Sequence, residues 1–166
     1  MNLLFKITSV LLATIRVDLH RPHPFAHERV GFISAGLSAT GGDVLILARE
    51  YRPVLDHDYL RDPSVGAMMG PDAIRKALQW AMQSGCALFH VHSHGGQGVP
   101  GFSSTDLREN AKFVPDFLKV APQCIHGVIV LSDTAARGQV WLDRQRPHSF
   151  VTFTEVGATI RTWRAA

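Results

Sequence analysis

Four residues within a fifteen-residue stretch have the types and spacing needed for metal chemistry. His92 and His94 are separated by one residue, and Ser103 and Asp106 follow beyond a glycine-rich segment. Histidines at positions i and i+2 project to the same side of a strand. A carboxylate from the next element can supply a third ligand and leave the fourth position to water. Three protein ligands with one open position are typical of a catalytic zinc site.

The local sequence predicts the elements that position these residues. The alternating apolar run at 86–94 predicts a strand, and the glycines of 95–101 predict a loop. A helix is predicted over 103–119, with Ser103 as its N-cap and Asp106 in its first turn. Pro115 is expected to kink this helix or to end it early.

Each part of the pattern also has an ordinary structural interpretation. Ser-x-x-Asp before a helix is often only a capping box, and single histidines are often core or surface residues. The combination of all four groups favours a metal site over caps and packing. His90 lies on the same strand face as the pair, so from spacing alone His90 and His92 could form the ligand pair instead.

The order His-x-His, loop, Ser-x-x-Asp resembles the signature of the JAMM (MPN+) zinc metallopeptidases, here of the stand-alone bacterial type. That family also has an upstream glutamate in the form Glu-x-x-Gly before apolar residues, and residues 28–36 fit this form. The resemblance extends over residues 8–143. It implies an α/β, single-domain MPN (JAMM, cytidine deaminase-like) fold, in which helices flank a mixed, curved β-sheet.

Two departures from the family pattern lie in the loop after the histidines. Eight residues separate His94 from Ser103, where the family usually has seven, and Gly95 stands where the family often has proline. Glycine tolerates positive φ, so a glycine-rich loop can absorb one extra residue. The family spacing selects His92 and His94 as the pair and leaves His90 as a core or supporting residue.

The resemblance also implies a role for each site residue. One Zn²⁺ per chain would be held by His92, His94 and Asp106, with water completing the tetrahedron. Glu28 would act as general base and pass the proton to the leaving amine. Ser103 would donate to the developing oxyanion. The alternatives are that Glu28 is an exposed charge at a strand start and that Ser103 is only an N-cap.

The implied activity is hydrolysis of the bond after the C-terminal glycine of a ubiquitin-like protein, in a bacterial ubiquitin-like conjugation or processing system. The bond could be an isopeptide or a linear peptide bond, and the partner would be the ubiquitin-like protein or its conjugates. Alternatives are a peptidase that processes sulfur-carrier proteins, a non-catalytic MPN scaffold and a RadC-like protein. Residues 55–70 lie where the family has an insertion over the substrate tail, so they are a candidate flap.

Composition narrows the remaining classes. The 166 residues fit one domain, 1–166, and the net charge of +3 comes without a Lys/Arg block, so nucleic-acid binding is not expected. Cys86 and Cys124 lack CxxC spacing and favour buried free thiols in a reducing cytoplasm over a disulfide. No segment approaches 18 consecutive apolar residues, so no membrane span is expected. The residues do not specify an oligomeric state.

The rest of the chain predicts alternating helices and strands. Helices are predicted over 9–19 and 71–84, where Pro71 starts the second helix and Gly85 ends it. A stripe with helical spacing is expected to pack in the core, namely Ile74, Ala77, Leu78, Ala81 and Met82. Strands are predicted over 29–38, 43–51, 125–131, 139–142 and 150–155, with a hairpin turn at 40–43 and mostly loop over 52–70.

Overall fold

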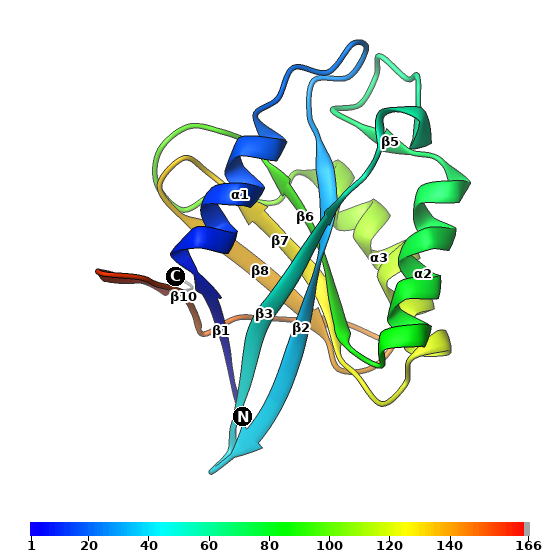
Figure 1. Cartoon of the computed structure of the whole chain (residues 1–166). Helices are drawn as coiled ribbons and strands as arrows, with labels where there is room; N and C mark the ends of the chain where they lie inside the picture. Colours follow the sequence, from blue (N-terminus) through cyan, green and yellow to red (C-terminus); the bar gives the residue numbers. More distant parts are fainter. Residues whose placement is uncertain (165–166) are drawn as a thin grey trace.

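The computed structural model describes residues 1–164 as a mixed sheet of nine strands with three α-helices packed on it (Figure 1). The strands of this sheet are β1 (Asn2–Thr8), β2 (Val30–Thr40), β3 (Asp43–Pro53), β6 (Ala87–Ser93), β7 (His126–Leu131), β8 (Ala136–Trp141), β9 (Pro147–Ser149), β10 (Thr152–Val156) and β11 (Ile160–Arg164). The α/β class and the mixed, helix-flanked sheet expected from the sequence are confirmed.

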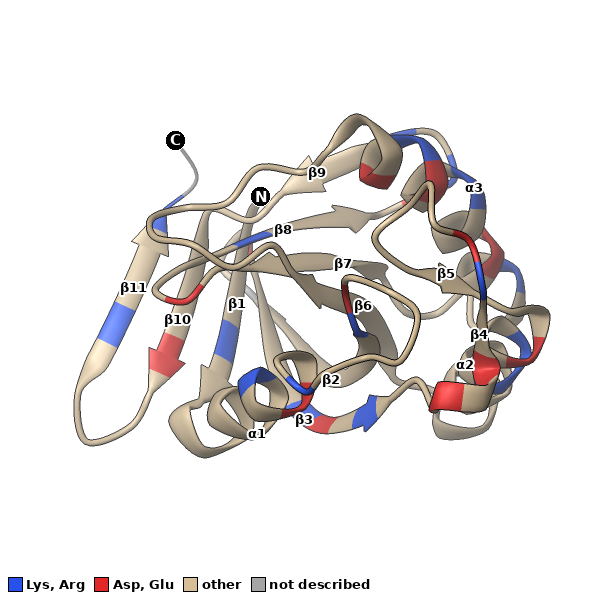
Figure 2. Cartoon of the chain, turned by 90° about the horizontal axis from the view of Figure 1, so that it is seen from above, with Lys and Arg blue, Asp and Glu red and all other residues tan. Residues whose placement is uncertain are grey.

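The strand order is β11-β10-β1-β3-β2-β6-β7-β8-β9. β1 runs parallel to both of its neighbours, β10 and β3, and β6 runs parallel to β7. The sheet curls, as Figure 2 shows, so that β10, near one end of the sheet, approaches β8, near the other. There the Phe150 N–H donates to the Gly138 carbonyl of β8, and the Val151 N–H donates to the Leu3 carbonyl of β1.

The helices lie on opposite faces of the sheet (Figure 1). α1 (Ser9–Leu19) buries Leu12 and Ile15 in one core, which also contains Phe89 and Val91 of β6. α2 (Pro71–Ser84) and α3 (Ser104–Val120) cover the other face, where Trp80 and Phe117 pack with Leu88. Successive residues of β6 therefore face α1 and the α2–α3 pair in turn, because side chains alternate along a strand.

Local signals define the helix ends that the sequence predicts. The Thr8 hydroxyl caps α1 by accepting from the Leu11 N–H, and α1 spans the predicted 9–19. α2 spans the predicted 71–84, with Pro71 at its start and Gly85 in the left-handed conformation at its end. Of the predicted stripe, Ala77, Leu78 and Ala81 pack in the core, whereas Met82 is 56% exposed and Ile74 is only partly buried and lies outside the core clusters.

The expectation that Pro115 ends its helix early is wrong, since α3 continues to Val120. Proline cannot donate to the carbonyl four residues earlier, which belongs to Ala111. Ala111 is exposed, so water can solvate that carbonyl. Val114 and Phe117 on either side of the proline are buried, and their packing holds the helix across this position.

Residues 52–70 contain more regular structure than the predicted loop. A 3₁₀ turn, η1 (Asp56–Asp58), precedes β4 (Tyr59–Leu60), which pairs antiparallel with β5 (Met68–Met69). β1, β9 and β11 also lie outside the predicted strands. β1 lies inside the sheet between β3 and β10, which are distant in the chain, whereas β9 and β11 are edge strands that pair with their neighbours in sequence, β8 and β10.

The two cysteines are free. The Cys124 thiol is buried and donates to the Gly85 carbonyl, whereas Cys86 is only partly buried, which corrects the expectation of two buried thiols. Among the described residues, no helix has the length and apolar character that crossing a membrane requires.

Candidate metal centre

The end of β6 and the start of α3 bring three side chains to one point. His92 Nε2 lies 3.1 Å from His94 Nε2 and 3.4 Å from Asp106 Oδ1. His94 Nε2 lies 3.2 Å from Asp106 Oδ2. The His92 side chain is only 2% exposed, while those of His94 and Asp106 are 27% and 18% exposed. The centre is therefore open to solvent on one side only.

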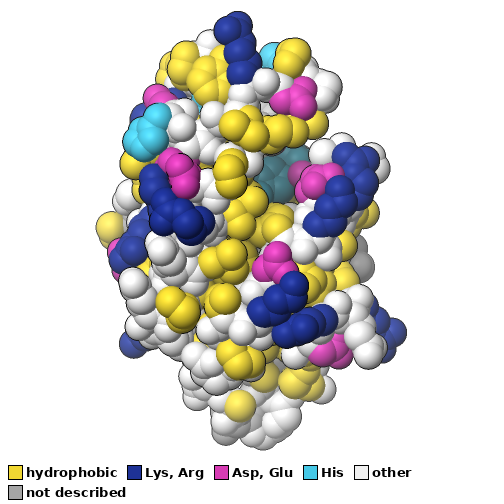
Figure 3. Space-filling model, turned by 90° about the vertical axis from the view of Figure 1, so that its right-hand side faces the viewer, with side chains coloured by type: hydrophobic (Ala, Val, Ile, Leu, Met, Phe, Trp, Pro, Cys, Tyr) yellow, Lys and Arg dark blue, Asp and Glu magenta, His cyan; other side chains and the backbone are white. Residues whose placement is uncertain are grey.

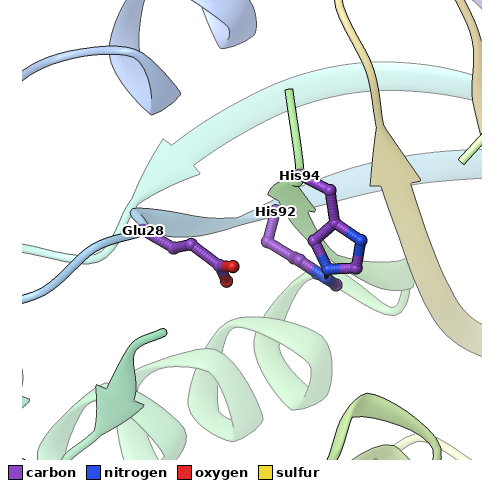
Figure 4. A group of neighbouring side chains, drawn as sticks. All are labelled: Glu28, His92 and His94. Carbon is purple, nitrogen blue, oxygen red and sulfur yellow. Dashed lines mark hydrogen bonds between the residues drawn. The ribbon is translucent and has the colours of Figure 1, made fainter. Parts of the chain in front are cut away.

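Glu28 completes the group from a different part of the chain (Figure 4). Val30 of β2 pairs with His92 of β6, so the residues just before β2 lie beside the end of β6. Ligand atoms of Glu28, His92 and His94 all lie within 4.8 Å of one another. These three residues could hold a metal ion.

Asp106 has a second role as part of a helix cap. Ser103 is the N-cap of α3, and its hydroxyl accepts from the Asp106 N–H at 3.1 Å. The Ser103 N–H and hydroxyl both donate to Asp106 Oδ2, at 2.7 and 2.8 Å. The predicted capping box is therefore present, and it fixes the orientation of the carboxylate. The Ser103 hydroxyl is engaged in this cap.

The surroundings of Asp106 keep it ionised. Burial alone would raise the pKa of this carboxyl. The hydrogen bond and charge of His92, with the two hydrogen bonds from Ser103, outweigh burial and hold the pKa of Asp106 well below its ordinary value. An ionised carboxylate beside two imidazoles is a donor set that suits a divalent transition metal.

The segment before β2 is held so that Glu28 faces the histidines. The Gly66 carbonyl accepts from the N–H groups of His27 and Glu28. The Tyr59 hydroxyl accepts from the Val30 N–H at 2.8 Å and donates to the Val30 carbonyl at 3.2 Å. Residues 55–70, the candidate flap, are therefore hydrogen-bonded to the backbone on both sides of Arg29, next to the metal centre.

Arg29 anchors the same segment from inside the protein, where it is 3% exposed. Its guanidinium donates to the carbonyls of Arg21 and Pro22 and to the carboxylate of Asp56. These charge-assisted hydrogen bonds tie the backbone next to Glu28 to residues 21–22 and to Asp56.

The loop after the histidines explains one departure from the family pattern. Gly95 has φ of 64°, which proline cannot adopt because its ring fixes φ near −65°. Gly96 and Gly98 also have positive φ. The Gly96 carbonyl accepts from the Asp133 N–H, and the Gly98 carbonyl accepts from the Ser132 hydroxyl, so the loop is tied to the turn after β7.

His90 is a buried residue of the same strand and is not in the three-residue cluster. Burial, together with the nearby His92, lowers its pKa to about 3, so the ring is neutral at physiological pH. It contacts Phe32 and Phe113 edge-on or tilted. Burial against these two aromatic rings fits the core or supporting role expected for His90.

The sequence analysis did not identify Tyr59, Gly66 or Asn110 near the centre. Tyr59 and Gly66 hold the Glu28 segment, and Asn110 lies one helical turn after Asp106 on α3. The (i, i+4) spacing of Asp106 and Asn110 is the one local signal that could have indicated a shared face. The other two approach through tertiary contacts that no local pattern reveals.

No family model and no curated protein matches this chain. Among the solved structures that match is the N-terminal domain of STIL from Trichoplax adhaerens, with 14% sequence identity and a TM-score of 0.41. The match covers 82% of this chain and 41% of that one, so the chain spans about two fifths of the matched structure.

Proposed function

We propose that this chain is a zinc metallopeptidase of the JAMM (MPN+) type, with an MPN fold. It would hydrolyse the peptide or isopeptide bond after the C-terminal glycine of a ubiquitin-like protein. His92, His94 and Asp106 would hold one Zn²⁺, Glu28 would be the general base, and Ser103 would stabilise the oxyanion.

The observation that carries this proposal is the set of distances between the donor atoms. His92 Nε2 and His94 Nε2 lie 3.1 Å apart, and Asp106 approaches each of them with a different oxygen, His94 with Oδ2 at 3.2 Å and His92 with Oδ1 at 3.4 Å. Zinc bound tetrahedrally at about 2.0–2.1 Å places its ligand atoms about 3.3 Å apart. The distance between the two histidine nitrogens is close to one edge of a zinc tetrahedron, and the carboxylates of Asp106 and Glu28 lie near enough to this pair to supply a further ligand.

The side chains around the centre can perform the rest of the reaction. Bound zinc would supply a Lewis acid and lower the pKa of a coordinated water to about 7. Glu28, across from the histidines, can accept a proton from the attacking water and deliver it to the leaving amine. The Ser103 hydroxyl donates to Asp106 Oδ2, so it must rotate to donate to the substrate oxygen instead.

The test is cleavage of a ubiquitin-like protein that carries a C-terminal extension, followed by intact-mass analysis. The zinc-loaded chain is expected to cut directly after the terminal glycine. Glu28→Gln should keep its zinc and lose about a hundredfold to ten-thousandfold in rate, because a positioned base contributes that much. Glu109→Gln is the matched control, since Glu109 lines the cleft beside the metal centre, which also reaches Glu28 and Asp106, but it bonds Arg108 and Lys112.

The zinc content of these variants separates the possible ligand sets. If Glu28→Gln lost its zinc, Glu28 would be a ligand, and the base would have to be another group. Absence of cleavage by the zinc-loaded chain on every ubiquitin-like substrate would contradict the peptidase proposal and favour a non-catalytic scaffold.

A further inference from the structure

The segments that lead into β6 and β7 each carry a cysteine. Cys86 directly precedes β6, and Cys124 lies two residues before the start of β7. Both strands start at the lower end of the sheet in Figure 1, and the metal centre lies at the opposite end of β6, about 20 Å away along seven residues of strand. Figure 3 shows the face on which the cleft beside that centre opens, a hollow whose floor carries a histidine. The two cysteines therefore lie outside the proposed active site.

The pairing of β6 with β7 brings the two cysteines to matching positions. The strands are parallel, Phe89 pairs with Gly127, and Cys86 and Cys124 each lie three residues before this pair. The Cys124 thiol donates at 3.0 Å to the carbonyl of Gly85, the residue next to Cys86. Neighbouring strands lie about 4.7–4.9 Å apart, and a disulfide joins Cα atoms about 4.4–6.8 Å apart. The backbone positions therefore suit a bond between these two sulfurs.

The two thiols differ in their surroundings. Cys86 is partly exposed, and the Arg49 guanidinium lies against it, with Nη1 3.7 Å from Sγ. Cys124 is only 8% exposed, and burial, together with the nearby Cys86, raises the pKa of its thiol. Cysteines that react with oxidants are accessible and lie beside positive charge, whereas buried cysteines are inert. Cys86 is therefore the thiol that an oxidant in solution meets first.

We propose that Cys86 and Cys124 are a reversible redox pair that hydrogen peroxide converts to a disulfide. First the Cys86 sulfur attacks one peroxide oxygen and the O–O bond breaks, which gives Cys86 sulfenic acid and water. The Cys124 sulfur then attacks the Cys86 sulfur and the S–O bond breaks, so that hydroxide leaves with the Cys124 thiol proton as a second water. Two thiols and one peroxide give one disulfide and two waters, and a thiol or phosphine reductant restores the pair.

The position of Cys124 favours the second step. Its bond to Gly85 holds the thiol beside Cys86, and the high effective concentration of a neighbouring group offsets the raised pKa of this thiol. Disulfide formation removes the bond to the Gly85 carbonyl. Gly85 is exposed, so water can solvate that carbonyl instead.

The disulfide closes a loop that contains the candidate metal ligands. Residues 86–124 include β6 and α3, and with them His92, His94 and Asp106. A cross-link restricts the unfolded chain more than the folded one, so it stabilises the fold. Peroxide is therefore expected to stabilise the segment that carries the metal ligands without reacting at any of them.

The cross-link is detected by treating the full chain with a small excess of hydrogen peroxide, alkylating the remaining thiols in denaturant and mapping tryptic peptides by mass spectrometry. The expected product joins peptides 77–108 and 120–137, with a combined mass lower by two hydrogens than that of the reduced peptides. A phosphine reductant should make both thiols available to alkylation again. The oxidised chain should also melt several degrees higher than the reduced chain.

Two variants separate the roles of the thiols. In Cys124→Ser the Cys86 sulfenic acid has no partner, so dimedone should trap it. In Cys86→Ser the buried Cys124 should stay available to alkylation after denaturation, and peroxide should not raise the melting temperature.

Two free thiols in the parent after peroxide, or sulfinic acid at Cys86 beside a Cys124 that is still a thiol, would overturn the redox pair. A disulfide that forms only between two chains would do the same. An intramolecular disulfide that leaves the melting temperature unchanged would overturn its stabilising role. These results do not depend on whether the chain binds zinc or cleaves a ubiquitin-like protein.

Discussion

At the scale of single residues, Asp106 joins two functions that the sequence alone could not separate. The Ser-x-x-Asp pattern predicts both a capping box and a metal ligand. The structure contains the capping box, and the same carboxylate also approaches both histidines. One oxygen bonds Ser103 while the other faces His92. The two interpretations are compatible because a carboxylate has two oxygens with separate lone pairs.

Asp106→Asn tests whether this carboxylate is a ligand. The amide can still accept in the cap, but it has no charge for the metal. Zinc affinity is expected to fall by more than tenfold while helix content stays the same. The measurement is zinc content after dialysis against a competing chelator, with circular dichroism to follow the helix.

Asp116→Asn is the control for Asp106→Asn, since Asp116 lies on the same helix and lines the same cleft. It should keep its zinc. Full zinc occupancy in Asp106→Asn would remove Asp106 from the ligand set and leave Glu28, His92 and His94 as the metal-binding group.

At the scale of elements, the segment 61–67 between β4 and β5 positions Glu28. The Gly66 carbonyl accepts from the N–H groups of His27 and Glu28. A Cβ at Gly66 would lie only 2.5–2.7 Å from the Glu28 carboxylate. Glycine is needed here for space, not for backbone conformation. The candidate flap is therefore in contact with the expected base.

Gly66→Ala is expected to lower turnover at least tenfold while zinc is retained, because the added methyl displaces the end of a flexible side chain and not the backbone. Gly101→Ala is the control, since a Cβ there would meet nothing within 4 Å. Rates and zinc content are measured together. A fully active Gly66→Ala enzyme would show that the Glu28 carboxylate does not need its observed position.

The elements also show how far the sequence could predict this fold. Helices 9–19 and 71–84 were predicted to the residue because caps, proline and glycine mark their ends locally. β1 was missed although Leu3, Phe5 and Ile7 alternate with less buried residues, since its partners β3 and β10 lie far along the chain. The helix predicted over 103–119 agrees with α3, and only the early end expected at Pro115 is wrong, because packing on both sides outweighs one lost hydrogen bond.

The same division holds for the candidate site. His92, His94, Ser103 and Asp106 lie in one short segment, so their spacing alone indicates that they meet. Glu28 was placed there by resemblance to a family, since more than sixty residues separate it from His92. Only the tertiary structure brings Gly66 next to the Glu28 carboxylate.

At the scale of the whole molecule, one sheet separates two cores, and a buried histidine helps to join its strands. His126 is fully buried at the start of β7. Its Nδ1 accepts from the Leu88 N–H, so Nε2 carries the proton and donates to the Ala121 carbonyl. The ring also stacks on Phe117. Protonation of Nδ1 would replace this acceptor with a donor and break the bond to Leu88.

This arrangement predicts that acid destabilises the metal-free fold. Burial lowers the pKa of His126 from 6.5 to about 4. Below pH 6.5 the unfolded chain takes up a proton that the folded chain does not accept until pH reaches about 4, so stability present above pH 6.5 is lost across this window. One such histidine contributes about 2 kcal/mol to the loss between pH 7 and pH 5.

His126→Asn keeps an acceptor for the Leu88 N–H but cannot titrate. Urea unfolding at pH 7 and pH 5 should therefore show a smaller loss of unfolding free energy in this variant than in the parent, by about 2 kcal/mol. His57→Asn, at a histidine whose side chain is 73% exposed, should behave like the parent. An equal loss in His126→Asn and the parent would show that the ring is not held neutral.

The parallel position of β1 between β3 and β10 also has a consequence for the order of folding. β1 can pair with β3 once about fifty residues have been synthesised, but its other edge has no partner until residues 152–156 emerge. Contacts between such distant segments slow folding and leave a strand edge exposed meanwhile. We expect the nascent chain to be most prone to aggregation in the later part of this interval. At that stage Asp106 has been synthesised, but β10 has not, so the outer edge of β1 has no partner.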